Sequence, residues 1–145
     1  MTEREMQYSL QLEETVATMI SNAEQYPVIQ ARGEPVVASF AIPNAKNPKI
    51  ILFCRSIKDF IKAFENTKTL SDSPEEFAIN IIENQARRIK TVHPAVIIMV
   101  VLSDYEEGRL DPDEAEEIME FIDVFFINKE VKHLPEAINA ILKES

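Results

Sequence analysis

The chain has 145 residues, a length that suits one domain with its own core, and its composition of 46% hydrophobic and 28% charged residues is typical of a soluble globular protein. The net charge of −10 argues against general affinity for nucleic acid or for an anionic membrane surface. We therefore expect a single α/β domain over residues 1–145 that has neither a membrane nor a nucleic acid as its partner.

Several chemistries are excluded by residues that are scarce in the sequence. Cys54 is the single cysteine, so there is no internal disulfide and no multi-cysteine metal site. The two glycines, Gly33 and Gly108, lie too far apart to build a phosphate-binding or dinucleotide-binding glycine loop. The first residues are acidic where a secretory signal would be basic and then apolar. The expected location is the cytoplasm.

The first predicted element is a helix between residues 4 and 24. Its apolar residues recur near helical spacing, and Tyr26 precedes a proline, which pushes it out of the helical region. Because this helix lies outside the alternation of strands and helices that follows, residues 1–24 are a candidate surface for a homodimer. The alternative is that the helix packs in the core of its own chain.

Three short strands are predicted next, at residues 28–31, 36–42 and 49–55. The connections between them are short and rich in turn-forming residues, which favours an antiparallel meander. Two helices follow. Ser56 begins the first, with Asp59 at the third position, and Ser73 begins the second, with Pro74 in its first turn.

The most informative stretch is the uninterrupted apolar run Ala95–Leu102. It is too short to cross a bilayer, and its β-branched residues predict a strand buried on both faces, at the centre of the sheet. Asp111 then begins a helix, Val124–Ile127 forms a further strand, and a helix starting at Leu134 closes the chain. The predicted fold is a mixed α/β sheet of about five strands with helices on both faces. An antiparallel three-stranded meander precedes a parallel strand-helix-strand-helix unit.

The loop after the apolar run is the first candidate site, because ligands of open parallel sheets bind beyond the carboxyl ends of strands. The candidate metal ligands are Asp104, Glu106, Glu107 and Asp111. Oxygen ligands of this kind suit Mg²⁺, Mn²⁺ or Ca²⁺. An EF-hand register starting at Asp104 fails, since Gly108 falls one position early. The simpler interpretation is a solvated acidic loop without a cofactor, leading into a helix whose first turn favours negative charge.

A second candidate site lies in residues 32–70, which carry seven bases and three acids. The candidate anion-binding residues are Arg55, Ser56, Lys58 and Lys62. They surround a helix start, where free backbone amides accept anions. A solvated helix face is the simpler explanation. Cys54 ends an apolar strand and is predicted to be a small buried hydrophobic residue instead of a nucleophile.

No catalytic residue is assigned, because no nucleophile, base or glycine loop can be assembled from the sequence. The leading interpretation is a small cytoplasmic interaction or regulatory module whose partner is a protein, either another chain or a second copy. One alternative is a divalent-metal-dependent enzyme acting on a phosphorylated substrate, with Asp104 and Glu107 as ligands and Arg55 or Lys58 holding the anion. A second alternative is an acidic protein that competes for a basic partner surface through residues 104–123.

Overall fold

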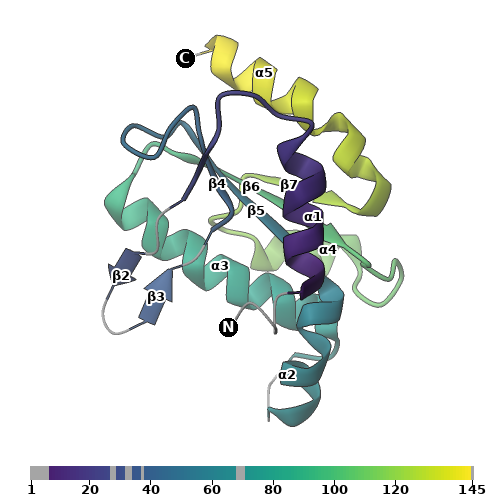
Figure 1. Cartoon of the computed structure of the whole chain (residues 1–145). Helices are drawn as coiled ribbons and strands as arrows, with labels where there is room; N and C mark the ends of the chain where they lie inside the picture. Colours follow the sequence, from purple (N-terminus) through teal and green to yellow (C-terminus); the bar gives the residue numbers. More distant parts are fainter. Residues whose placement is uncertain (1–6, 27–28, 32–33, 37, 68–70, 145) are drawn as a thin grey trace.

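The computed structural model describes residues 7–26, 29–31, 34–36, 38–67 and 71–144, which form a five-stranded mixed sheet, a separate two-stranded hairpin and helices on both faces of the sheet (Figure 1). The strands are β1 (Glu24–Gln25), β2 (Ile29–Ala31), β3 (Glu34–Val36), β4 (Phe40–Ile42), β5 (Ile50–Ser56), β6 (Ile97–Ser103) and β7 (Val124–Ile127). The α-helices are α1 (Gln7–Ala17), α2 (Ile61–Asn66), α3 (Pro74–Val92), α4 (Pro112–Ile118) and α5 (Leu134–Glu144), with 3₁₀ turns η2 (Ile57–Asp59) and η3 (Asn128–His133).

The main sheet has the strand order β1-β4-β5-β6-β7. Strands β1, β4 and β5 are antiparallel neighbours, whereas β5, β6 and β7 run parallel to one another. The predicted mixed sheet, with an antiparallel meander followed by a parallel strand-helix-strand-helix unit, is therefore confirmed. The middle position belongs to β5, whose seven residues are all buried, and the predicted central run forms its neighbour β6.

The first part of the meander differs from the prediction. The segment predicted at 28–31 leaves the main sheet and pairs as β2 with β3, and the short strand β1 takes its place beside β4. The segment predicted at 36–42 is divided between β3 and β4. Pro35 lies within β3 and has no N–H for a ladder hydrogen bond. This residue therefore suits a strand that is paired on one side, as β3 is in the hairpin, better than a strand inside the main sheet. Val28 and Val37 lie outside the described residues.

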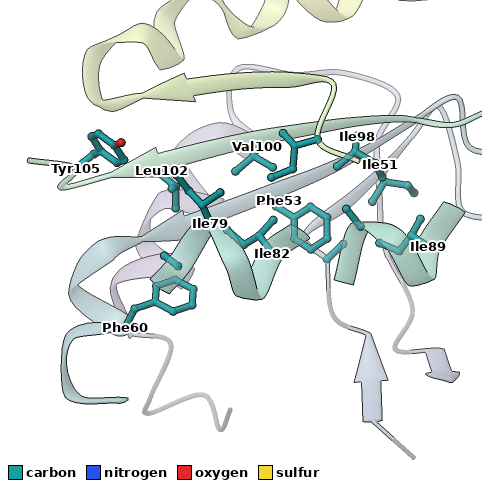
Figure 2. Packing of buried hydrophobic residues seen from close by; sticks show 14 of the residues in the cluster. Ile51, Phe53, Phe60, Ile79, Ile82, Ile89, Ile98, Val100, Leu102 and Tyr105 are labelled. Carbon is teal, nitrogen blue, oxygen red and sulfur yellow. The ribbon is translucent and has the colours of Figure 1, made fainter. Parts of the chain in front are cut away.

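The two faces of the sheet carry two separate hydrophobic clusters. Strands β5 and β6 alternate their side chains, so Phe53 and Val100 face α3 and α4, while Leu52 and Val101 face α1 and α5. Figure 2 shows the α3 residues Ile79, Ile82 and Ile89 directed at the first of these faces. Among the described residues no helix is long and apolar enough to cross a bilayer.

The helix starts follow the predicted capping residues. Ser73 Oγ accepts the Glu76 N–H at the start of α3, and the Asp111 carboxylate accepts the Asp113 N–H at the start of α4. Helix α1 is shorter than predicted and ends at Ala17, where the Thr18 hydroxyl donates to the Thr15 carbonyl oxygen and competes with the helical ladder. Residues 4–6 of the predicted helix lie outside the described part.

Candidate functional site

The carboxyl ends of the three parallel strands lie together at one end of the sheet. Ser56 of β5 pairs with Ser103 of β6, and Asp104 and Asn128 directly follow β6 and β7. Both Asp104 and Asn128 have a positive φ, 57° and 51°. Aspartate and asparagine tolerate this left-handed conformation better than other non-glycine residues. The chain therefore turns sharply at two adjacent strand ends, the position where open α/β sheets bind ligands.

Asp104, a candidate metal ligand, contacts two of the candidate anion-binding residues, Ser56 and Lys58. Ser56 Oγ donates to Asp104 Oδ2 at 2.6 Å, and Lys58 Nζ lies 3.8 Å from Asp104 Oδ1. The Lys58 ammonium also lies 5.0 Å from the centre of the Tyr8 ring. Since the Lys58 and Asp104 side chains are 51% and 40% exposed, water screens this ion pair strongly. The stronger tie is the hydrogen bond from the fully buried Ser56.

The other candidate metal ligands have separate roles. Glu106 pairs with Arg109 at 2.6 Å, Asp111 caps α4, and Glu107 lies beside a groove described below. Within the described ranges, no three His, Cys, Asp or Glu side chains are grouped so that they could hold one metal ion. The metal site stays a prediction without a convergent ligand set.

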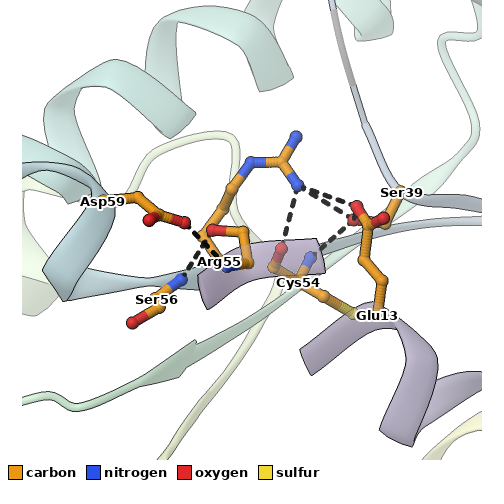
Figure 3. A network of polar contacts seen from close by, with 7 residues as sticks. Glu13, Ser39, Cys54, Arg55, Ser56 and Asp59 are labelled. Carbon is orange, nitrogen blue, oxygen red and sulfur yellow. Dashed lines mark hydrogen bonds and ion pairs between the residues drawn. The ribbon is translucent and has the colours of Figure 1, made fainter. Parts of the chain in front are cut away.

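Of the candidate anion-binding residues, Arg55 is engaged inside the protein (Figure 3). Its Nη1 lies 3.3 Å from Glu13 Oε1 and donates to Ser39 Oγ and to the Cys54 carbonyl oxygen, both at 2.9 Å. Burial lowers the pKa of Arg55 and the Glu13 carboxylate opposes that effect. Lys62 is exposed on α2. Anion binding by this set stays a prediction, and it would rely on Lys58 and Lys62 more than on Arg55.

The polar network around Arg55 completes the sheet beyond Phe40, where β4 begins and its pairing with β5 stops. Strand β4 pairs with β5 only as far as Leu52, so the later backbone N–H groups of β5 need other partners. Ser39 Oγ accepts the Cys54 N–H at 3.0 Å, and Ser9 Oγ of α1 accepts the Ser56 N–H at 2.9 Å. Helix α1 thus lies where a longer β4 would continue, with serine hydroxyls in place of backbone carbonyls.

Asp59 has a different role from the one predicted for it. Its carboxylate does not return to Ser56, as in a capping box, but accepts the N–H groups of Tyr8 and Ser9 at 3.2 and 2.6 Å. It therefore satisfies backbone donors at the start of α1 and attaches that helix to η2. The sequence carried no signal for this contact, because the partners are about fifty positions apart in the chain.

Cys54 is buried beside this network. Its side chain is completely inaccessible, and desolvation raises the pKa of the thiol to about 12. A buried thiol that stays protonated is a poor nucleophile. The geometry therefore agrees with the prediction of a small buried hydrophobic residue.

A groove of about 250 Å³ runs between α4 and β7, and we call it the α4–β7 groove. It is lined by Tyr105, Glu107, Gly108, Leu110, Pro112, Ala115, Met119, Phe125, Ile127 and Glu130. Apolar and aromatic side chains form most of the wall, and the carboxylates of Glu107 and Glu130 are exposed at its rim. Gly108 has a φ of 98°, which only glycine adopts without strain, so the turn at the rim needs this residue.

The surface around the groove is strongly acidic. Residues 104–123 include ten acids and one base. The exposed acids of this stretch are Asp104, Glu106, Glu107, Asp111, Asp113, Glu114, Glu116, Glu117, Glu120 and Asp123. The base, Arg109, lies 2.6 Å from Glu106 Oε2 and 3.7 Å from Oε1 of Glu75, which is 1% exposed. Lys58 lies 3.8 Å from Asp104 and Lys90 lies 2.8 Å from Asp123. These two cations and Arg109 thus stand beside the ten acids, and the stretch keeps a strong excess of negative charge.

Two side chains far away in the sequence hold the loops that border the groove. Asn128 Oδ1 accepts the Tyr105 N–H and Asn128 Nδ2 donates to the Tyr105 carbonyl oxygen, each at 2.8 Å. Burial, followed by the charges of Glu75 and Glu107, raises the pKa of Tyr105. In the connection between α4 and β7, the Glu83 carboxylate accepts three successive N–H groups, those of residues 120 to 122. Sequence reasoning identified neither arrangement.

These features define the class of the protein as a mixed α/β domain with an acidic, apolar-lined groove beside its edge strand. No known protein family, curated protein or solved structure matches the chain.

Proposed function

We propose that the chain is a protein-interaction module that binds a basic partner surface through the acidic face formed by residues 104–123. The observation that carries this proposal is the one-sided charge of that face, where ten acids stand against Arg109, Lys58 and Lys90, each of which is already paired with a carboxylate of the face. Like charges concentrated on one face repel one another, and an oppositely charged partner relieves that repulsion while accelerating association. A location in the cytoplasm and a regulatory role through competition for the partner belong to the same proposal.

The apolar groove supports binding of a protein in preference to binding of small cations. Protein interfaces combine a buried apolar centre with a polar rim, and the α4–β7 groove provides that combination. Its volume of about 250 Å³ is below the usual range of about 300–1,000 Å³ for pockets that enclose a small molecule. A space of this size suits one large side chain of a partner.

The test compares binding of lysine-rich and glutamate-rich peptides to the purified chain by fluorescence anisotropy. We expect the lysine-rich peptide alone to bind, with an affinity that falls as salt screens the acidic face. Replacing Glu114 and Glu117 with lysine should weaken this binding at least tenfold. Replacing the exposed Glu14 and Glu136, on α1 and α5, alters the net charge equally and should have a much smaller effect. Equal weakening by both pairs would refute the acidic face as the binding surface.

A second copy of the chain is the other partner considered, with α1 as the contact. Val16 and Ser9 of α1 are buried in their own chain, so self-association would use the opposite side of the helix, where Tyr8 is 39% exposed. Light scattering on the full chain and on Tyr8→Glu tests this proposal. A dimer that becomes a monomer on substitution would support it, and a monomeric full chain would refute it.

A further inference from the structure

The outer edge of β7 borders the α4–β7 groove. Strand β7 ends the sheet, and among the described residues its only strand neighbour is β6. The Ile97 N–H donates to the Lys49 carbonyl oxygen on the β5 side, so the backbone groups of the alternate residues Ile98, Val100 and Leu102 face β7. In the β6–β7 register, these groups pair with Val124 and Phe126. Phe125 and Ile127 consequently direct their backbone N–H and C=O groups away from the sheet, and the Glu130 carboxylate already accepts the Ile127 N–H at 2.8 Å. All four residues of β7 are half-buried, whereas β5 is buried throughout.

We infer that a basic, extended segment of a partner protein adds to the sheet along Phe125 and the Ile127 carbonyl and inserts one large apolar side chain into the α4–β7 groove. This inference rests on the proposed function and specifies the form of its partner. An exposed sheet edge gains affinity from main-chain hydrogen bonds, while pockets for alternate side chains supply specificity. The groove is a pocket of this kind, because Phe125 and Ile127 of β7 form part of its wall.

Charge complementarity selects a basic segment as the occupant. Glu107 and Glu130 lie at the rim, and Glu116 lies one helical turn after Pro112 on the same side of α4 that lines the groove. Glu120 precedes β7 and is exposed, whereas Asp123 is already paired with Lys90 at 2.8 Å. A segment whose lysines alternate with apolar residues would place its cations near these carboxylates, and an acidic segment would be repelled.

The probe is a fluorescent synthetic peptide with a central leucine and lysines on both sides, measured by anisotropy against the full chain. We expect binding that weakens about tenfold or more when the leucine is replaced by alanine, since that side chain leaves the groove. A peptide whose alternate backbone nitrogens are methylated should bind at least tenfold more weakly, because it cannot pair with a strand edge. Binding should slow hydrogen exchange of the Phe125 amide.

Variants of the chain complete the test without changing its core. The double substitution Glu107→Lys and Glu116→Lys should reduce affinity at least tenfold, and Glu14→Lys with Glu136→Lys is the control of equal net charge. Circular dichroism and thermal melting would verify that each variant is folded.

The measurements distinguish failure of the strand-addition inference from failure of the proposed function. If the alanine and N-methyl peptides bind as tightly as the parent, the strand-addition inference is wrong and the acidic interaction face remains. If no lysine-rich peptide binds at all, the proposed function is wrong as well.

Discussion

Arg55 and Cys54 are adjacent in the chain and both are buried, but in different surroundings. Cys54 belongs to the cluster beneath α1 and α5, whereas the Arg55 guanidinium lies 5.6 Å from the centre of the Phe53 ring, which belongs to the other cluster. A buried guanidinium needs a carboxylate, because the cost of removing its charge from water is otherwise uncompensated. Glu13 supplies that charge, and Ser39 uses both its donor and its acceptor capacity within the same network. The thiol next to Arg55 keeps its proton because the surroundings are dry.

The Glu13–Arg55 pair should be essential for stability. Glu13→Ala leaves the Arg55 charge buried without its carboxylate, so we expect a loss of about 3 kcal/mol in the free energy of unfolding. This value is at the low end of the usual range because the Glu13 side chain is 22% exposed. Urea denaturation measures the effect, and Glu14→Ala, at the exposed neighbouring position, should change stability by less than about 0.5 kcal/mol. A loss no larger than in this control would contradict the assigned role.

The buried thiol predicts a pH dependence. An unfolded cysteine releases its proton near pH 9.0, whereas Cys54 in the native chain keeps it until about 12. Between these values the native state binds more protons, so stability falls as pH rises, by about 1.4 kcal/mol per pH unit at most. Below pH 9 this contribution is fully present.

Urea unfolding of the native chain and of Cys54→Ala at pH 8, 9 and 10 isolates the contribution of the thiol to the free energy of unfolding. The raised pKa values of Tyr26 and Tyr105 act in the same direction, but they affect both proteins equally. We expect the native chain to lose stability more steeply above pH 9. Parallel pH profiles would show that the thiol is not held protonated.

At the level of secondary structure, the connections around α4 are held by side chains of other elements. Helix α4 has only seven residues, and an isolated helix of that length is not stable in water. Its position depends on the Asp111 cap, on the buried Ala115 and on the Glu83 carboxylate of α3, which binds the loop that follows. The position of α4, which forms one wall of the α4–β7 groove, therefore depends in part on the Glu83 carboxylate of α3.

Removing that contact should loosen the loop more than the rest of the fold. In Glu83→Ala, the N–H groups of Glu120, Phe121 and Ile122 lose their carboxylate, and we expect a destabilisation of about 2 kcal/mol. Hydrogen exchange of these three amides should accelerate before that of β5 or β6. Glu117→Ala, on the exposed side of α4, is the control. Unchanged exchange at residues 120–122 would show that the loop is held in another way.

Over the whole molecule, the charge is divided unevenly along the chain. The acids gather around α4, and the basic residues 46, 49, 58 and 62 lie in the segment from the β4–β5 connection to α2. The four carboxylates first considered as metal ligands belong to the acidic face, but three of them already have partners within the chain, namely Ser56, Arg109 and the start of α4. Hydrogen bonds and ion pairs of this kind reduce the repulsion that a cation would otherwise relieve.

Millimolar Mg²⁺ or Mn²⁺ should therefore raise the melting temperature no more than an ionic-strength control does. A ligand specific for the folded state would add about 2.7 kcal/mol at a hundredfold excess over its Kd, which is several degrees for a domain of this size. Melting curves with each cation and with a chelator make the comparison. A larger rise that disappears in Asp104→Asn and Glu107→Gln would establish the metal site instead.

Local features of the sequence were sufficient to predict much of the fold. These features depend on a few neighbouring positions, so they can be recognised without knowledge of the rest of the chain. They are the apolar run of β6, the caps at Ser73 and Asp111, and the short connections of the meander. They also suggested the acidic stretch after β6 as a candidate site, which stays a prediction. They could not show which residues would lie opposite one another.

The tertiary structure decided those pairings. Arg55 meets Glu13 across 42 positions, Asp59 meets Ser9 across 50, and Glu83 meets Phe121 across 38. Each charge has several oppositely charged or polar candidates in the sequence, and the choice follows from how the helices pack on the sheet. The groove arises in the same way, since its walls come from the β6–α4 loop, α4 and β7, which become adjacent only because the parallel crossover returns the chain to the sheet.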